Sequence, residues 1–222
     1  MEAVMSRIIR IALLLLIIIA GASGVYLKHS REIKLDMRDE ALLYFREQDY
    51  EKAIDCFEKA GARKTLFSDE IDTDINCYLA ESYRQLGEYK EAIDLYDTML
   101  RWSPANKRCY ILKGDCLEKD GQDKEAVECY EEGYKKTGDA DFLLKLCKAS
   151  MRKKDYKSAH KYADKGIEKE EDSKDVFLFE KIVIYEKQQK YKKAWKTAKK
   201  YIKLYPEDEK GRKEYIFLSS RI

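Results

Sequence analysis

Histidine and cysteine are the side chains of this sequence best suited to bind a metal ion or to act as nucleophiles. The two histidines, His29 and His160, lie far apart in the chain, and no His-x-x-x-His pair occurs. No Cys-x-x-Cys pair occurs either, although that spacing is the usual mark of a zinc site. We therefore predict no metal site and no cofactor.

The six cysteines are scattered along the middle of the chain. They are Cys56, Cys77, Cys109, Cys116, Cys129 and Cys147. Cys109 and Cys116 would lie about 10 Å apart on one helix, which is too far for a disulfide. Scattered thiols are typical of small core residues. Their even number leaves disulfides open if the protein faces an oxidising compartment.

Acidic side chains are numerous, but lysines accompany them along the same segments, as on the solvated face of a helix. Glu180 and Glu186 would belong to a carboxylate pair only if the fold happened to bring two such groups together. Neither a glycine-rich phosphate loop nor a nucleophile elbow is present. The sequence is therefore predicted not to encode an enzyme.

Long helices joined by short turns are the elements that the composition predicts. The chain has only 2 prolines and 10 glycines, whereas 39% of its 222 residues are charged. This composition favours helices over strands. Many of the 17 tyrosines stand at recurring positions, which indicates internal repeats.

A short pattern, formed by a turn residue, a tyrosine and an alanine, recurs five times. The copies begin at Gln48, Gly87, Gly121, Lys154 and Gln189, and their alanines are Ala53, Ala92, Ala126, Ala159 and Ala194. The third copy has Asp123 in place of the tyrosine. Glycine or a small polar residue suits a tight reversal, and alanine suits the point where two helices cross most closely.

This pattern resembles the tetratricopeptide repeat, a helix pair with a period of 34 residues. The resemblance covers residues 34–206 and implies an all-α, right-handed solenoid of about five helix hairpins. The hairpins are predicted over residues 34–67, 73–106, 107–139, 140–173 and 175–206. Residues 207–222 are predicted to form a capping helix, with Tyr215, Ile216 and Leu218 covering the last hairpin.

Residues 8–27 are predicted to form a transmembrane helix that precedes the repeats. The run from Ile11 to Leu27 contains no charged residue. About 20 helical residues cover the hydrocarbon layer of a bilayer. Residues 1–10 would then form a basic tail and residues 28–33 a juxtamembrane linker. The sequence thus predicts a single-pass membrane protein.

Two features of the N-terminal segment leave alternatives. The small residues that end at Ala22 also resemble a signal-peptide cleavage site, and cleavage there would release a secreted protein. The basic residues that follow the segment, such as Lys28 and Arg31, place the repeats in the cytoplasm. The short basic head of a signal anchor instead places them outside. The side of the membrane stays open.

The resemblance also implies where a partner would bind, because the first helices of tetratricopeptide hairpins form a concave wall. The residues that would line this groove are Arg38, Leu42, Arg46, Glu81, Arg84, Arg108, Ile111, Lys148 and Phe179. Some members clamp a peptide carboxylate with five residues of that wall. Only Arg38 and Arg108 suit such a clamp here, so that class of ligand is not expected.

Charge is distributed unevenly along the predicted repeats. Residues 34–144 contain 17 basic and 27 acidic residues, a net charge of −10, whereas residues 145–203 contain 19 basic and 9 acidic residues, a net charge of +10. The main hypothesis is a membrane-anchored scaffold that binds a partner protein or peptide. The alternative is a module that binds anionic lipid or cell-wall polymer through residues 145–203. No nucleic-acid partner is expected, because no nucleic-acid-binding module is recognisable.

Overall fold

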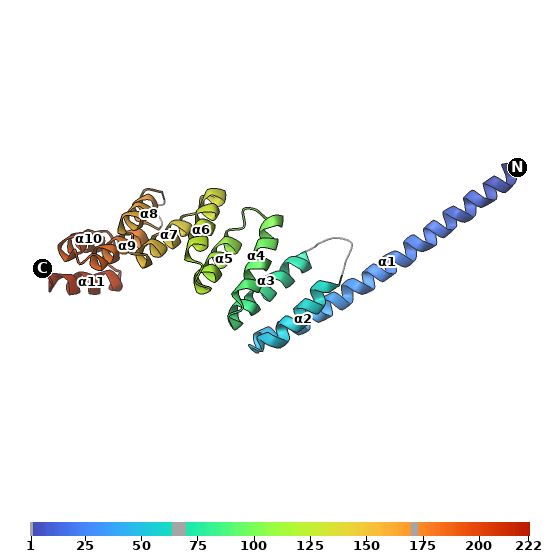
Figure 1. Ribbon diagram of the computed structural model, residues 1–222, viewed down its shortest axis with the longest axis horizontal. Helices are drawn as coiled ribbons and strands as arrows, with labels where there is room; N and C mark the ends of the chain where they lie inside the picture. Colours follow the sequence, from blue (N-terminus) through green and yellow to red (C-terminus); the bar gives the residue numbers. More distant parts are fainter. Residues whose placement is uncertain (1, 64–69, 170–172) are drawn as a thin grey trace. The chain divides into compact units, whose positions relative to one another are not determined.

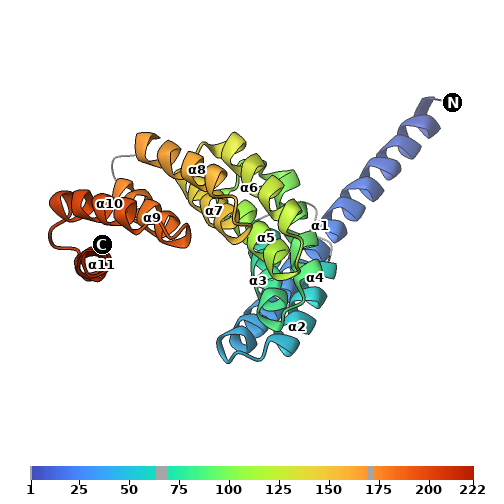
Figure 2. The same ribbon diagram turned by 60° about the vertical axis from the view of Figure 1, so that its left-hand side comes forward.

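The computed structural model describes the backbone of residues 2–63, 70–169 and 173–222, and their side chains except at 2–12, 14, 18–20 and 22. Within these ranges the chain forms eleven α-helices and no strand (Figures 1 and 2). The helices are α1 (Glu2–Arg46), α2 (Tyr50–Ala62), α3 (Glu70–Leu86), α4 (Tyr89–Trp102), α5 (Lys107–Lys119), α6 (Asp123–Thr137), α7 (Ala140–Arg152), α8 (Tyr156–Lys169), α9 (Lys174–Lys187), α10 (Tyr191–Leu204) and α11 (Glu209–Ser219).

The helices belong to two compact units, Met1–Met99 and Leu100–Ile222. The first unit holds α1, α2, α3 and most of α4, and the second holds α5 to α11. The sequence predicts a single array over residues 34–206, whereas the structure divides the chain within α4. Inside each unit, helices that follow one another in the chain lie side by side, as α1 and α2 do in the first and α7 and α8 in the second (Figure 1).

All five predicted hairpin turns reverse at a residue with positive φ. These residues are Gln48, Gly87, Gly121, Lys154 and Gln189, with φ between 57° and 82°. At every turn, the amide of the next residue donates to the carbonyl five residues back, over 2.8–3.0 Å. This hydrogen bond belongs to the Schellman motif, which ends a helix at a left-handed residue. The recurring turn residue of the sequence is therefore the residue at which the first helix of each pair ends.

The recurring alanine lies where the two helices of a pair meet. Ala53, Ala92, Ala126, Ala159 and Ala194 all have 0% of their surface exposed. Full burial at all five positions is what a residue between two packed helices requires.

The last helix, α11, packs on α10 (Figure 2). Leu218 is fully buried and Tyr215 is half-buried there, as predicted. The prediction for Ile216 is wrong, because 68% of its surface is exposed. Gly211, Tyr215 and Leu218 follow helical spacing along the inner face of α11, and Ile216 is turned about 100° away from Tyr215.

In the second unit, several glycines are the residues against which aromatic rings pack. A β-carbon added to Gly133 would lie 2.4 Å from the ring of Phe142, and one added to Gly166 would lie 2.5 Å from the ring of Phe177. Both rings are buried. In each case the glycine belongs to the second helix of one pair and the ring to the first helix of the next. Glycine therefore sets the distance between consecutive hairpins.

A lysine is buried in the first unit. Lys34 of α1 is 1% exposed, and its ammonium group forms an ion pair with Asp72 of α3. It also donates to the carbonyl of Arg63, at the end of α2, over 3.3 Å. This one charged group thereby joins the two helices of the first hairpin, α1 and α2, to α3 of the next hairpin.

Helix α1 is continuous from Glu2 to Arg46. Among its described side chains, Leu13, Leu15, Leu16 and Ile17 are each more than half exposed. Over the part of the chain that the structure describes, no helix combines the length and the apolar character needed to cross a membrane. The structure thus gives no support to the transmembrane helix predicted at 8–27. Within that span, the side chains at 8–12, 14, 18–20 and 22 lie outside the described residues.

Candidate functional site

Three of the predicted groove residues line one hollow on α1. Arg38, Leu42 and Arg46 are four residues apart, so they project from the same side of the helix. The hollow has a volume of about 640 Å³, and its lining is completed by Asp36, Asp39, Glu40 and Leu43. The structure therefore brings the predicted residues of the first hairpin together.

We call this hollow the α1 hollow. Its side chains differ in their contacts and in their exposure. Arg38 is held in place, because its guanidinium donates to Asp39 over 2.6 Å and to Asp74 of α3 over 3.3 Å. Leu42 packs against the core of the first unit. Arg46 is exposed and Leu43 is 58% exposed, so both are available to a ligand. The hollow thus combines a paired cation, an exposed cation and an apolar surface.

The predicted residues of α3 lie elsewhere and bind each other. The guanidinium of Arg84 donates to Glu81 over 2.9 Å, and Gln85 donates to the same carboxylate over 2.6 Å. Glu81 and Arg84 do not line the α1 hollow. Their charges largely neutralise one another within one turn of helix.

In the second unit, ion pairs link the first helices of successive hairpins. Lys145 of α7 lies 2.6 Å from Asp115 of α5. The predicted groove residue Lys148 of α7 pairs with Glu180 of α9 over 3.6 Å. Positions expected to face a ligand therefore carry contacts between hairpins. Of the other predicted residues here, Arg108 is exposed and Ile111 is half-buried.

Phe179 belongs to the contact with the capping helix. Its ring meets the ring of Tyr201 edge to face, with centroids 5.8 Å apart, and the ammonium of Lys210 lies 4.0 Å from its centroid. A ring covered on these sides adds to the packing of α9, α10 and α11.

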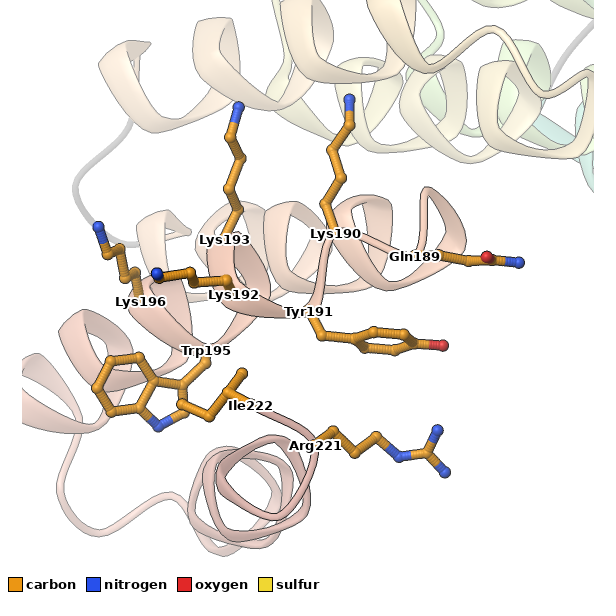
Figure 3. Close-up of a pocket in the computed structure, with 9 residues that line it drawn as sticks. All are labelled: Gln189, Lys190, Tyr191, Lys192, Lys193, Trp195, Lys196, Arg221 and Ile222. Atoms are coloured by element: carbon orange, nitrogen blue, oxygen red, sulfur yellow. The ribbon is translucent and has the colours of Figure 1, made fainter.

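A second hollow, which the sequence analysis did not predict, lies beside the first turn of α10. It has a volume of about 840 Å³ (Figure 3). Its lining residues are Gln189, Lys190, Tyr191, Lys192, Lys193, Trp195, Lys196, Arg221 and Ile222. We call it the α10 hollow. The cluster of lysines around a tryptophan was visible in the sequence, but the contribution of residues after α11 was not.

A pair of carboxyl groups joins α9 to α11. Burial, followed by a hydrogen bond to Glu214 and repulsion from its charge, raises the pKa of Glu186 from 4.5 to about 7. Arg221 and Lys187 act in the opposite direction with smaller effect. Glu186 therefore keeps a proton at mildly acidic pH, shared through its hydrogen bond to Glu214, because a charge on Glu186 would be repelled by that neighbour.

This pair predicts a decline in stability as pH rises. Between pH 4.5 and about 7 the folded chain keeps a proton on Glu186 that the unfolded chain loses, so folding becomes less favourable across this window. The pair is partly exposed, so we expect a loss of about 1 kcal/mol between pH 5 and pH 8. Urea unfolding followed by circular dichroism at the two pH values measures it.

The variant Glu186→Gln is the control for this pH effect. It removes the shared proton but keeps His160, whose pKa is lowered by burial and then by Lys181 and which therefore adds stability as pH rises. Glu186→Gln should lose the decline. An identical pH dependence of the two proteins would contradict the shared proton.

The structure also shows how metal-binding side chains and thiols are placed. Within the described residues, no group of three or more histidine, cysteine or acidic side chains is placed to hold a metal ion. None of the six cysteines, all of which the structure describes, forms a disulfide. Burial raises the pKa of Cys147 to about 12, so this thiol is poorly suited to act as a nucleophile.

Comparisons with known proteins agree with this geometry. Residues 38–107 and 83–137 match two models of the tetratricopeptide repeat. No curated protein matches the chain. A tetratricopeptide repeat protein from Parabacteroides merdae is similar in structure, with a TM-score of 0.65, 14% identity, and coverage of 83% of this chain and 72% of that one.

Two further solved structures have the same fold. MamA from Desulfovibrio magneticus gives a TM-score of 0.61 at 16% identity and covers 79% of this chain and 97% of its own. YrrB gives 0.54 at 18% identity and covers 79% and 88%. The chain thus has the fold of tetratricopeptide repeat proteins, and residues 38–137 carry the sequence pattern of that repeat.

Proposed function

We propose that this chain is a non-enzymatic scaffold that binds a segment of another protein at the α1 hollow. The observation that carries the proposal is that Arg38, Leu42 and Arg46, predicted as groove residues, line one hollow of about 640 Å³. A cavity of this size accepts several side chains of a peptide. Among similar structures, YrrB is described as a tetratricopeptide repeat protein with an unusual peptide-binding site.

The lining of the α1 hollow suits a segment of mixed character. Leu43 offers an exposed apolar surface, and Arg46 offers a cation with a planar group that can bind a carboxylate through two hydrogen bonds. Asp36 and Glu40 would receive basic side chains on the other side. We therefore expect a partner segment that carries an apolar residue between charges of both signs.

Site-specific photocrosslinking tests this proposal. A photoreactive residue at Leu43 should give distinct protein adducts in cells, whereas the same residue at the exposed Glu51 of α2 should not. Adding Arg46→Glu, which reverses the charge of this exposed side chain, should reduce the Leu43 adducts by more than half. Identical adducts from Leu43 and Glu51, unaffected by Arg46→Glu, would refute a site at this hollow.

We further propose that residues 8–27 anchor the scaffold in a membrane as a single-pass helix. Two observations support this: the absence of charge between Ile11 and Leu27, and the exposure of Leu15, Leu16 and Ile17 on a continuous helix. Exposed aliphatic side chains lose about 0.8 kcal/mol of hydrophobic stabilisation for each CH₂ that stays in water. Insertion into lipid would remove them from water without breaking the helix.

Membrane fractionation measures the anchor. The full chain should remain in the membrane pellet after carbonate extraction, and its intact mass should include residues 1–22. Leu15→Arg combined with Ile17→Arg should move most of it to the supernatant, whereas the control Leu43→Arg should not. A soluble species that begins at Ser23 would instead establish the secreted form.

A further inference from the structure

The α10 hollow has the size of a binding site. Its volume, about 840 Å³, lies within the range of pockets that hold small ligands or several peptide side chains. In Figure 3, Tyr191, Trp195, Arg221 and Ile222 surround the opening. The hollow lies entirely within the second unit, between the start of α10 and the residues that follow α11.

Two side chains of the hollow, Trp195 and Arg221, are held by contacts with neighbouring residues. The indole nitrogen of Trp195 donates to the hydroxyl of Ser219 over 3.0 Å, and the indole stacks on Tyr215 with centroids 6.1 Å apart. The guanidinium of Arg221 is held over the rings of Tyr191 and Phe217, at 5.6 and 4.4 Å. A ligand therefore loses little free energy in ordering these side chains.

All of the charged side chains that line the α10 hollow are positive. Five of its nine lining residues are lysine or arginine, and none is acidic. Over the described part of the chain, no carboxylate lies within ion-pair distance of Lys192 or Lys196, and both extend on the side of Trp195 (Figure 3). These cations are left for a partner of opposite charge.

The helix dipole increases this positive potential. The first turn of α10 contains Lys192 and Lys193 and no acidic residue, and its N-cap is Lys190. Lysine at this end opposes the partial positive charge of the helix N-terminus, and so reduces the stability of the helix. An anionic ligand placed here would interact favourably with both the lysines and the free amide groups.

The shape of the hollow distinguishes between anionic partners. A membrane surface is bound by apolar side chains that protrude into it. Here Tyr191 and Trp195 are half-buried side chains that line the hollow, so they can pack against a side chain of a partner. We propose that the α10 hollow binds an acidic peptide segment whose large apolar side chain packs against Tyr191, Trp195 and Ile222 while its carboxylates meet Lys192, Lys196 and Arg221.

This proposal goes beyond the partner site at the α1 hollow, since the two surfaces belong to different units. Trp195 provides the reporter. The only other tryptophan, Trp102, is 75% exposed, so Trp102→Phe leaves a single reporter with little effect on packing. A short peptide of aspartates and glutamates around one phenylalanine should change the fluorescence of Trp195 in a saturable manner, and its affinity should fall at least tenfold between 50 and 300 mM salt.

Matched variants of the full chain and of the peptide test the contacts. Replacing the phenylalanine with alanine, or Lys192 and Lys196 with glutamate, should weaken binding at least tenfold. Replacing Lys200 and Lys203 of the same helix, which do not line the hollow, with glutamate should weaken it less than threefold. Arg46→Glu at the α1 hollow should leave it unchanged.

Three results would overturn the proposal. They are the absence of a saturable response, equal losses from both pairs of lysine variants, and binding that does not depend on the phenylalanine. Vesicles containing phosphatidylserine are the competing probe. A response of Trp195 to these vesicles without a response to the peptide would assign the hollow to a membrane surface instead.

Discussion

The variant Asp72→Asn is expected to lower the free energy of unfolding of the first unit by about 3 kcal/mol, because it leaves the ammonium of Lys34 buried without its counter-ion. Lys34 is 1% exposed, whereas its partner keeps 23% of its side-chain surface. Asparagine has nearly the same shape as aspartate and still accepts a hydrogen bond. The loss of unfolding free energy therefore measures the effect of removing the negative charge. Urea unfolding of the full chain at neutral pH measures it.

Two variants show whether the loss comes from the buried charge. Asp74→Asn changes the same helix in the same way, but its partner Arg38 is more exposed and lies 3.3 Å away, so we expect a loss of at most about 1 kcal/mol. Lys34→Met removes the buried charge and keeps most of the volume. Its loss should be smaller than that of Asp72→Asn. Equal losses from Asp72→Asn and Asp74→Asn would contradict the buried ion pair.

The hairpins could be predicted from the sequence because their geometry depends on local chemistry. A turn residue that tolerates positive φ and an alanine five residues later identify each reversal, and both properties are visible in single residues such as Gly87 and Ala92. The left-handed conformation of Gln48 and Lys154 was predictable only from their place in the repeat. Neither residue type prefers this conformation by itself.

The functional side chains were less predictable because their environment depends on residues distant in the sequence. The register of α1 places Arg38, Leu42 and Arg46 together, as expected for one helix face. Phe179 follows the same register, yet Lys210 of the capping helix covers it. The shared proton of Glu186 likewise depends on a residue of α11, and no pattern in the sequence pairs these two carboxylates.

The burial of Lys34 shows the same limit. From the sequence alone, Lys34 is expected to be solvated at the start of a helix, next to the predicted membrane linker. Its position on the face of α1 that also carries Ala41 makes it a core residue, and only the approach of α3 supplies Asp72. Helical periodicity identifies the face of a residue, but the partner that neutralises a charge is set by tertiary packing.

The spacing between hairpins of the second unit predicts a large effect for Gly166→Ala. The new β-carbon would lie 2.5 Å from the ring of Phe177, which is 1% exposed and has no room to rotate away. Overpacking of this kind lowers stability by about 1–3 kcal/mol, and the higher helix propensity of alanine returns up to about 1 kcal/mol. We expect a net loss of about 2 kcal/mol, measured by urea unfolding.

The control is Gly61→Ala, at which the nearest atom, in Ile75, lies 3.8 Å away. This variant should gain about 0.5–1 kcal/mol, because the helix becomes more favourable and nothing must move. Combining Gly166→Ala with Phe177→Leu should cost less than the sum of the two single losses, since the smaller side chain makes room for the methyl group. Strict additivity, or a gain from Gly166→Ala alone, would show that the ring of Phe177 does not set the spacing.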